Sequence, residues 1–179
     1  MAERPQWYGL MAEFDDPTAL LEAARRTRAE GYTHTDAYSP FPIEHLSEAL
    51  GFRRTRLPLV VLISGLVGGL GGYFMQWYAA VVSYPFNIGG RPYHSWPSFI
   101  PATFELTVLC AAFGAVLGML ALNGLPMPYH PVFNVAKFEL ATRSHFFLVV
   151  ESRDPRFDLD KTRAFLQGLG ARDVTEVAW

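Results

Sequence analysis

The chain has 179 residues, half of them hydrophobic, and a formal net charge of −2 with an isoelectric point near 6.2. A weakly acidic chain without a basic block offers no surface for nucleic acid, so this class of partner is excluded. The single cysteine, Cys110, excludes a disulfide framework, a paired-cysteine zinc site, c-type haem attachment and an iron–sulfur cluster. The five histidines lie outside the long apolar runs, so we expect no redox cofactor in this chain.

The first part of the chain predicts a strand followed by a helix. Residues 1–7 are polar and charged and lack the apolar core of a removable signal peptide. Asp15 and Asp16 are interpreted as helix caps, Pro17 suits the first helical position, and Gly31 suits the helix end. The preceding strand is expected over Trp7–Phe14, with these residues alternating on one face: Tyr8, Leu10, Ala12 and Phe14.

A second strand and a short helix are expected next. The strand covers residues 32–38 and stops before Pro40, because proline cannot donate to a sheet. The helix covers residues 43–50 and closes at Gly51. Residues 6–56 are therefore predicted as strand, helix, strand and short helix.

Two long apolar runs follow, over Leu57–Ser83 and residues 102–125, and the only charged residues between Leu57 and Leu125 are Arg91 and Glu105. Each run exceeds the roughly 20 residues that a helix needs to cross a hydrocarbon core. Lipid offers no partner for backbone N–H and C=O groups, so the runs must cross as helices. The sequence therefore predicts two transmembrane helices joined by a loop over residues 84–101.

Small residues recur at four-residue intervals in both runs. They do not form the G-x-G-x-x-G pattern of a dinucleotide site, and an uninterrupted apolar run has no loop to hold a pyrophosphate. Such spacing bares a helix surface to which another backbone can come close; the alternative is that glycine is simply common in membrane helices. The predicted helix-packing interface consists of Gly65, Gly68, Gly69, Gly72, Ala111, Gly114, Ala115 and Gly118.

Basic residues precede the first apolar run and follow the second. The connecting loop carries only Arg91. By the positive-inside rule, both termini are expected in the cytoplasm and the loop over residues 84–101 in the periplasm. The basic residues on which this orientation depends are Arg53, Arg54, Arg56, Lys137 and Arg143.

The last part of the chain repeats the order strand, helix, strand. The strands are expected over residues 145–151 and 173–179, with Asp158 or Asp160 capping the helix between them. The sequence leaves residues 132–144 open between helix and strand. His130 is expected to be a packed turn residue rather than a ligand or proton donor.

We predict that residues 1–56 and 126–179 form one cytoplasmic α+β domain of the ferredoxin-like, split βαβ kind, because neither half buries its apolar face alone. The transmembrane hairpin over residues 57–125 is then an insertion within this domain. The alternative is two independent mini-domains of about 55 residues each, whose cores would be marginal in size.

Long irregular segments occur at residues 37–43, 84–92, 95–105 and 129–134. They resemble the ActD subunit family of bacterial alternative complex III, a quinol:electron acceptor oxidoreductase, and the resemblance covers nearly the whole chain. It implies a cofactor-free, non-catalytic accessory subunit in the inner membrane, within a respiratory or photosynthetic electron-transport chain. The implied partners are polytopic quinone-interacting subunits of the polysulfide-reductase type, together with subunits that carry haem c and iron–sulfur clusters.

Glu105 is the one ionisable residue inside a predicted span, where a carboxylate usually faces protein or water. We expect it about one turn past Pro101, near the outer interface and the positive end of the helix dipole, where a carboxylate is favoured. A structural role is therefore preferred, and the alternative hypothesis is that Glu105 contributes to proton release or to a quinol pocket shared with a neighbour.

The outer loop is too aromatic for an ordinary solvated connection. We expect it to dock on outer-side subunits, and the alternative is an interfacial aromatic belt in lipid. The residues predicted to dock are Tyr84, Phe86, Arg91, Tyr93 and Trp96.

Two other functions remain as alternatives. The chain could be a membrane-tethered sensor or regulatory domain that binds a small ligand, an analogy that rests on fold alone. A small transporter or channel formed by self-association is disfavoured because Glu105 is the only ionisable group in the spans. No Ser, His and acid set with a recognisable nucleophile elbow appears, so catalysis by the isolated chain is not expected.

Overall fold

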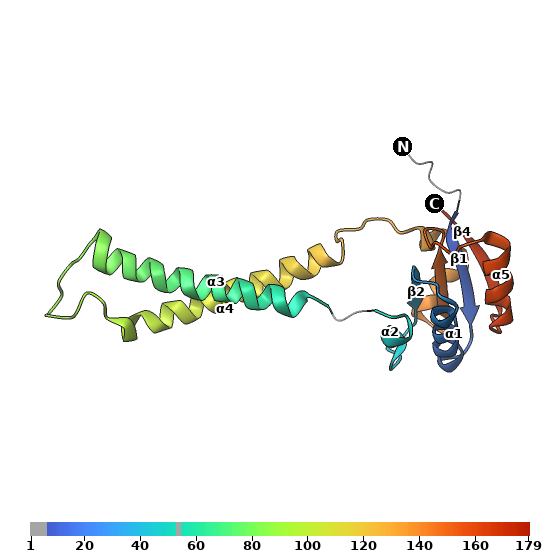
Figure 1. Cartoon of the computed structure of the whole chain (residues 1–179), viewed down its shortest axis with the longest axis horizontal. Helices are drawn as coiled ribbons and strands as arrows, with labels where there is room; N and C mark the ends of the chain where they lie inside the picture. Colours follow the sequence, from blue (N-terminus) through green and yellow to red (C-terminus); the bar gives the residue numbers. More distant parts are fainter. Residues whose placement is uncertain (1–6, 53–54) are drawn as a thin grey trace. The chain divides into compact units, whose positions relative to one another are not determined.

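The computed structural model describes residues 7–52 and 55–179 of the chain (Figure 1). The chain divides into two compact units, one formed by both ends of the sequence and the other by Arg54–Met127. Arg53 and Arg54, on which the predicted orientation partly depends, lie outside the described residues.

The first unit is a four-stranded antiparallel sheet with the strand order β2-β3-β1-β4 (Figure 1). Helix α1 follows β1, and helix α5 connects β3 to β4. The strands are β1 (Trp7–Phe14), β2 (Thr35–Tyr38), β3 (Phe146–Glu151) and β4 (Asp173–Ala178), and the helices are α1 (Pro17–Glu30), α2 (Leu46–Ala49) and α5 (Leu159–Gly168). Both strand–helix–strand segments that the sequence predicts are confirmed.

The caps of the two long helices follow the prediction. The carboxylate of Asp16 accepts hydrogen bonds from the backbone N–H groups of Thr18 and Ala19 at 3.0 and 3.1 Å, which satisfies donors that lack an intrahelical partner. Gly31 ends α1 with φ at 100°, a conformation that glycine adopts without strain. Of the two candidate caps for α5, Asp158 is the one that holds the helix start.

Apolar side chains fill both faces of the sheet. On one face Leu10, Ala12 and Phe14 pack against α1, α2 and α5. Tyr8 was expected on this face, but it lies on the other one with Met11. The cause is a register shift between Trp7 and Gly9 opposite β4, a bulge that inserts one extra residue and reverses the alternation of side chains.

Strand β2 and helix α2 are both shorter than predicted. Strand β2 begins at Thr35, because the backbone N–H groups of Thr33 and His34 bind the carboxylate of Asp154 instead of a strand. Helix α2 begins at Leu46, because His45 has φ at 64°, outside the range of a right-handed helix.

The segment whose structure the sequence left open forms two short 3₁₀ helices, η2 (Pro131–Asn134) and η3 (Ala136–Thr142). They cover the second face of the sheet, where Val132 and Phe138 pack against Phe147 and Val149. The sheet is therefore covered on both faces, by α-helices on one and by 3₁₀ turns on the other.

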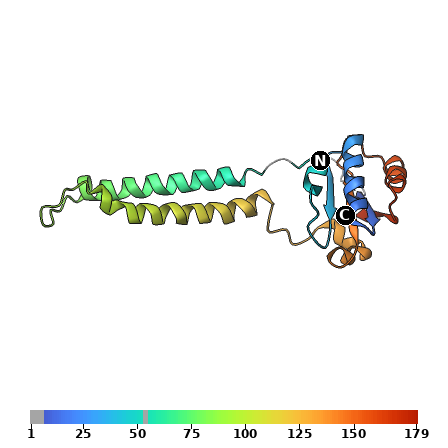
Figure 2. The ribbon, with the colours of Figure 1, turned by 90° about the horizontal axis from the view of Figure 1, so that it is seen from below.

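The second unit contains helix α3 (Leu57–Trp77), which continues as the wider turn η1 (Tyr78–Ser83), and helix α4 (Trp96–Leu122). By length and composition alone, Leu57–Ser83 and Trp96–Leu122 are long and apolar enough to cross a membrane. The two helices lie side by side (Figures 1 and 2). Helix α4 starts six residues earlier than predicted because Pro97 occupies the first turn, where its missing N–H is not needed.

Candidate functional site

The contact between α3 and α4 is built on glycine. A methyl group at Gly68 would lie 2.5 Å from the carbonyl oxygen of Leu106 and 2.6 Å from Cβ of Cys110, so only glycine fits there. A methyl group at Gly72 would lie 2.7 Å from the Leu106 side chain, and one at Gly69 would lie 2.6 Å from the Thr107 hydroxyl. The two backbones therefore come close, as small residues at four-residue spacing allow.

The small residues of α4 face α3 in return. A methyl group at Gly114 would overlap the Ser64 side chain, and one at Gly118 would lie 3.0 Å from the Val60 side chain. The methyl group of Ala111 lies opposite Gly65, and a methyl group added at Gly65 would lie 3.5 Å from it, an ordinary van der Waals contact. Ala115 is half-buried. Most of the predicted small-residue positions thus line the contact between the two helices of this chain.

Gln76 is a polar link between the helices that the sequence reasoning missed. Its side-chain amide donates to the carbonyl oxygens of Gly72 and Phe99, both at 3.1 Å, and contacts the Thr103 hydroxyl at 3.2 Å. The available signal was that Gln76 is the one side-chain amide in Leu57–Ser83. Nearby, the Tyr73 hydroxyl lies 2.7 Å from Nε2 of His94.

Glu105 is exposed on the side of α4 that faces away from α3. Its carboxylate has no hydrogen bond or ion pair with any of the described residues, 7–52 and 55–179. Because α4 begins at Trp96, Glu105 lies about 13 Å along the helix from its amino end. The dipole effect fades within the first turn, so the expected stabilisation by the helix end does not apply.

The loop between η1 and α4 exposes its aromatic side chains. Tyr84 and Phe86 are 74% and 66% exposed and stack on each other with ring centroids 6.1 Å apart. Tyr93 in the loop is also exposed, at 44%, and so is Trp96, the first residue of α4, at 57%. Arg91, the one charged residue of the loop, is exposed and makes no ion pair with the described residues.

A charged cluster lies at one end of β1. The Glu13 carboxylate is almost fully buried and lies 3.7 Å from Lys137 and from His145. Asp15 is not a helix cap, as had been expected: it accepts a hydrogen bond from Arg172 at 2.8 Å. Oxygen and nitrogen atoms of Glu13, Asp15 and His145 come close enough together to bind a cation. The guanidinium of Arg172 already contacts Asp15 and His145, so the set fits an ion-pair network better than a metal.

Ion pairs in and beside this cluster, which also include Asp173 of β4, shift the pKa values of their members toward the charged forms. A hydrogen bond from Lys137 at 2.7 Å lowers the pKa of the Asp173 carboxyl, and the same bond raises the pKa of Lys137. The hydrogen bond to Asp15 raises the pKa of Arg172. These pairs are exposed and contribute little to stability; they link Lys137 of η3 to Asp173 of β4, and Asp15 after β1 to Arg172 before β4.

His130 is a packed turn residue, as predicted. Its Nδ1 accepts a hydrogen bond from the backbone N–H of Val132 at 3.4 Å, and its Nε2 lies 3.4 Å from the Tyr8 hydroxyl. Tyr8 donates to the Glu151 carboxylate at 3.0 Å. Burial and the negative charge of Glu151 raise the pKa of Tyr8, so the phenol stays protonated and donates this bond.

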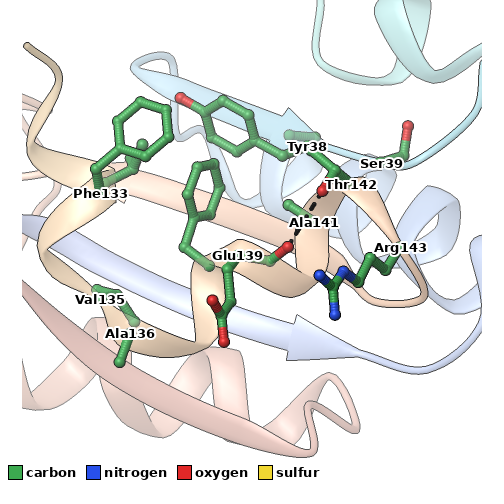
Figure 3. Close-up of a pocket in the computed structure, with 12 residues that line it drawn as sticks. Tyr38, Ser39, Phe133, Val135, Ala136, Glu139, Ala141, Thr142 and Arg143 are labelled. Atoms are coloured by element: carbon green, nitrogen blue, oxygen red, sulfur yellow. Dashed lines mark hydrogen bonds between the residues drawn. The ribbon is translucent and has the colours of Figure 1, made fainter.

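The first unit also contains an open groove, which the sequence did not predict (Figure 3). Its volume is about 910 Å³, and it lies between the end of β2, at Tyr38 and Ser39, and the η2–η3 segment. Phe133 is 71% exposed beside it, and Glu139 and Arg143 are its charged lining residues. The lining is mainly apolar and aromatic, so the groove suits an apolar molecule rather than a polar metabolite.

Comparison with known proteins identifies one family. A family model described as "Alternative complex III, ActD subunit" matches residues 8–176. The match spans both strand–helix–strand segments and both long helices. Comparison with curated proteins gives no match.

Proposed function

Because the chain belongs to the ActD subunit family of alternative complex III, we propose that it is a cofactor-free integral membrane subunit of a quinol:electron acceptor oxidoreductase. It serves as an accessory subunit, and the chemistry belongs to other subunits of a respiratory or photosynthetic electron-transport chain. The family match over residues 8–176 carries this proposal.

Helices α3 and α4 cross the bacterial inner membrane. The exposed side of α3 supports this assignment, since large apolar residues such as Leu66, Leu70 and Phe74 are more than half exposed. Burying them in lipid removes apolar surface from water, the main driving force for insertion. Both termini lie in the cytoplasm and the loop over residues 84–95 in the periplasm, as the basic residues flanking the helices indicate.

The first unit is a ferredoxin-like domain of the split βαβ kind. Two strand–helix–strand segments and the antiparallel strand order β2-β3-β1-β4 support this assignment. The label describes topology and implies no cluster. The domain is cytoplasmic and holds the assembly from that side.

The subunit packs beside polytopic quinone-interacting subunits of the polysulfide-reductase type. Its glycine faces are used by the contact between α3 and α4, so these partners dock on outward-facing side chains of the helix pair rather than on its glycines. The periplasmic loop docks on the subunits that carry haem c and iron–sulfur clusters, and the exposed rings of Tyr84, Phe86, Tyr93 and Trp96 support this assignment. For Glu105 a structural role at a contact with a neighbouring subunit is preferred, and the alternative is a part in proton release or in a quinol pocket shared with that neighbour.

Copurification tests the proposal. An affinity-tagged chain expressed in its natural host is extracted with mild detergent, and the eluate is examined for haem absorbance and for quinol oxidation. We expect haem-bearing subunits and activity to elute with the chain. A chain that elutes alone from membranes that still oxidise quinol would refute the assignment. For the role of Glu105, an unchanged pH profile of quinol oxidation in the Glu105→Gln complex would refute a part in proton or quinol chemistry.

The groove of Figure 3 favours one alternative, a membrane-tethered sensor of a small apolar ligand. A thermal-shift screen of the detergent-solubilised chain tests it, with Ala136→Trp, a change at an exposed lining residue, as the variant that fills the groove. A ligand that stabilises the wild-type chain but not Ala136→Trp would support the sensor. The absence of any such ligand would leave the accessory subunit as the better account.

A further inference from the structure

The exposed faces of the two helices differ in one respect. The exposed face of α3 is uniformly apolar between Leu59 and Met75, apart from the bare backbone at Gly71. The exposed face of α4 carries Glu105 between Phe104 and Val108, which are themselves 67% and 50% exposed. One face is therefore suited to lipid along its whole length, and the other is not.

A lone carboxylate in the hydrocarbon region needs a partner, because lipid offers neither a hydrogen-bond donor nor a counter-charge. Among the described residues none supplies one: the Gln76 amide bonds to Phe99 and Thr103 across the contact between the helices, and the Thr107 hydroxyl donates to the Thr103 carbonyl oxygen of its own helix. Glu105 lies on the opposite side of α4 from that contact. The described part of this chain, residues 7–52 and 55–179, therefore offers Glu105 no partner, which points to a neighbouring subunit.

We propose that the α4 face formed by Pro101, Phe104, Glu105, Val108 and Ala112 is the docking site for a transmembrane helix of a polytopic partner that presents an arginine or lysine to Glu105, while the exposed face of α3 lies against lipid. The proposal rests on the membrane position given under the proposed function. Charge complementarity selects the partner, since the face offers one anion within an apolar surface. Arginine or lysine on the other helix would meet the same restriction in lipid and be satisfied by the same contact.

Substitution of Glu105 separates this role from an internal one. In the tagged complex, Glu105→Leu leaves the partner's cation buried without a counter-charge. We therefore expect about tenfold or greater loss of copurifying polytopic subunit. Glu105→Gln keeps hydrogen-bonding capacity and is expected to lose less. In the full chain purified alone in detergent, Glu105→Leu should leave the thermal unfolding temperature unchanged, because the carboxylate has no partner among the described residues.

A pair of matched truncations tests which face docks. Phe104 on α4 and Leu70 on α3 are similarly exposed, at 67% and 73%. We expect Phe104→Ala to lower recovery of the polytopic subunit severalfold and Leu70→Ala to leave it at the wild-type level.

Three results would overturn the proposal. If the Glu105→Leu chain copurified as much polytopic subunit as the wild-type chain, the α4 face would not be this docking site. Equal losses with Phe104→Ala and Leu70→Ala would remove the difference between the faces. A lower unfolding temperature for the Glu105→Leu chain alone would assign Glu105 an internal role. The wild-type sample is read separately: if its copurifying proteins lack haem, the assignment to the oxidoreductase fails, and the Glu105 comparison is still made on the proteins that are present.

Discussion

The side-chain amide of Gln76 in α3 donates a hydrogen bond to the backbone carbonyl oxygen of Phe99 in α4, with the two atoms 3.1 Å apart. The same amide reaches the Thr103 hydroxyl, so one side chain ties α3 to two successive turns of α4. Close packing at the glycines and this polar link act on the same contact. Together they make the helix pair a single structural element.

Gln76→Leu should loosen the helix pair. Hydrogen bonds between helices in membranes contribute on average less than 1 kcal/mol, so we expect a loss of about 1 kcal/mol in the free energy of unfolding. Thermal unfolding of the full chain in detergent measures it. Met75→Leu is the matched control, because Met75 is the exposed neighbour at 57% and should tolerate the change. Equal stability of the two variants would show that the amide contributes nothing.

Gly68→Ala should destabilise the helix pair, whereas Gly71→Ala should not. The added methyl group at Gly68 meets the Leu106 carbonyl oxygen at 2.5 Å, whereas nothing lies within 4 Å of the one at Gly71. Overpacking at Gly68 should cost about 2 kcal/mol or more, because the clash is with backbone. Alanine at Gly71 should be neutral or stabilise by up to about 1 kcal/mol through helix propensity. Unfolding temperatures in detergent decide between them, and similar losses at both positions would contradict the packing described.

Asp154→Asn should destabilise the first unit. The Asp154 side chain is fully buried and accepts from the backbone N–H groups of Thr33, His34 and Arg156 at 2.6 to 2.8 Å. It thereby ties the loop after β3 to the loop that precedes β2. An amide cannot accept all of these bonds, so we expect a loss of about 2 kcal/mol in urea unfolding. Asp160→Asn, an exposed change on α5, serves as the control and should have little effect.

The same carboxylate makes stability depend on acid. Burial opposes ionisation of Asp154, but the backbone hydrogen bonds outweigh it and lower its pKa from the ordinary value of 3.8. A carboxyl with a lower pKa in the folded state binds fewer protons there than in the unfolded state. Its contribution to stability is therefore present above the unfolded-state pKa and lost as the pH falls from about 5 through the folded-state pKa. The urea midpoints of the wild-type chain and of Asp154→Asn should converge as the pH falls. If the difference between the two midpoints stayed constant with pH, Asp154 would not be the source of the acid sensitivity.

Local chemistry made much of the fold predictable. Asp16 followed by Pro17 indicates the start of α1, and Gly31 indicates its end. Both could be predicted because helix caps depend on residues that are near neighbours in the chain. The apolar runs are visible for the same reason. The exposed aromatic residues proposed to dock, and Glu105, could be named as candidates from residue type and position alone.

Features that depend on distant residues were not predictable. The reversal of Tyr8 depends on a bulge opposite β4, and the late start of β2 depends on Asp154, which lies about 120 residues further along the chain. The groove needs β2 and η3 to come together, and no local pattern signals that. Gln76 carried a signal, a lone amide in an apolar run, but its partners in α4 could not be named without the structure.

The outer loop gives the last prediction. Replacing both Tyr93 and Trp96 with Ala should release the haem-bearing outer subunits during purification, because exposed aromatic side chains at an interface often contribute about 2 kcal/mol or more each. Haem absorbance per tagged chain measures the loss. Tyr78→Ala is the control, since Tyr78 is 49% exposed at the start of η1 but lies outside the loop. If the rings instead form a belt in lipid, all three changes should lower the amount of chain in the membrane while haem per chain stays constant. A fall in haem per chain confined to the Tyr93 and Trp96 variant would place the loop against protein.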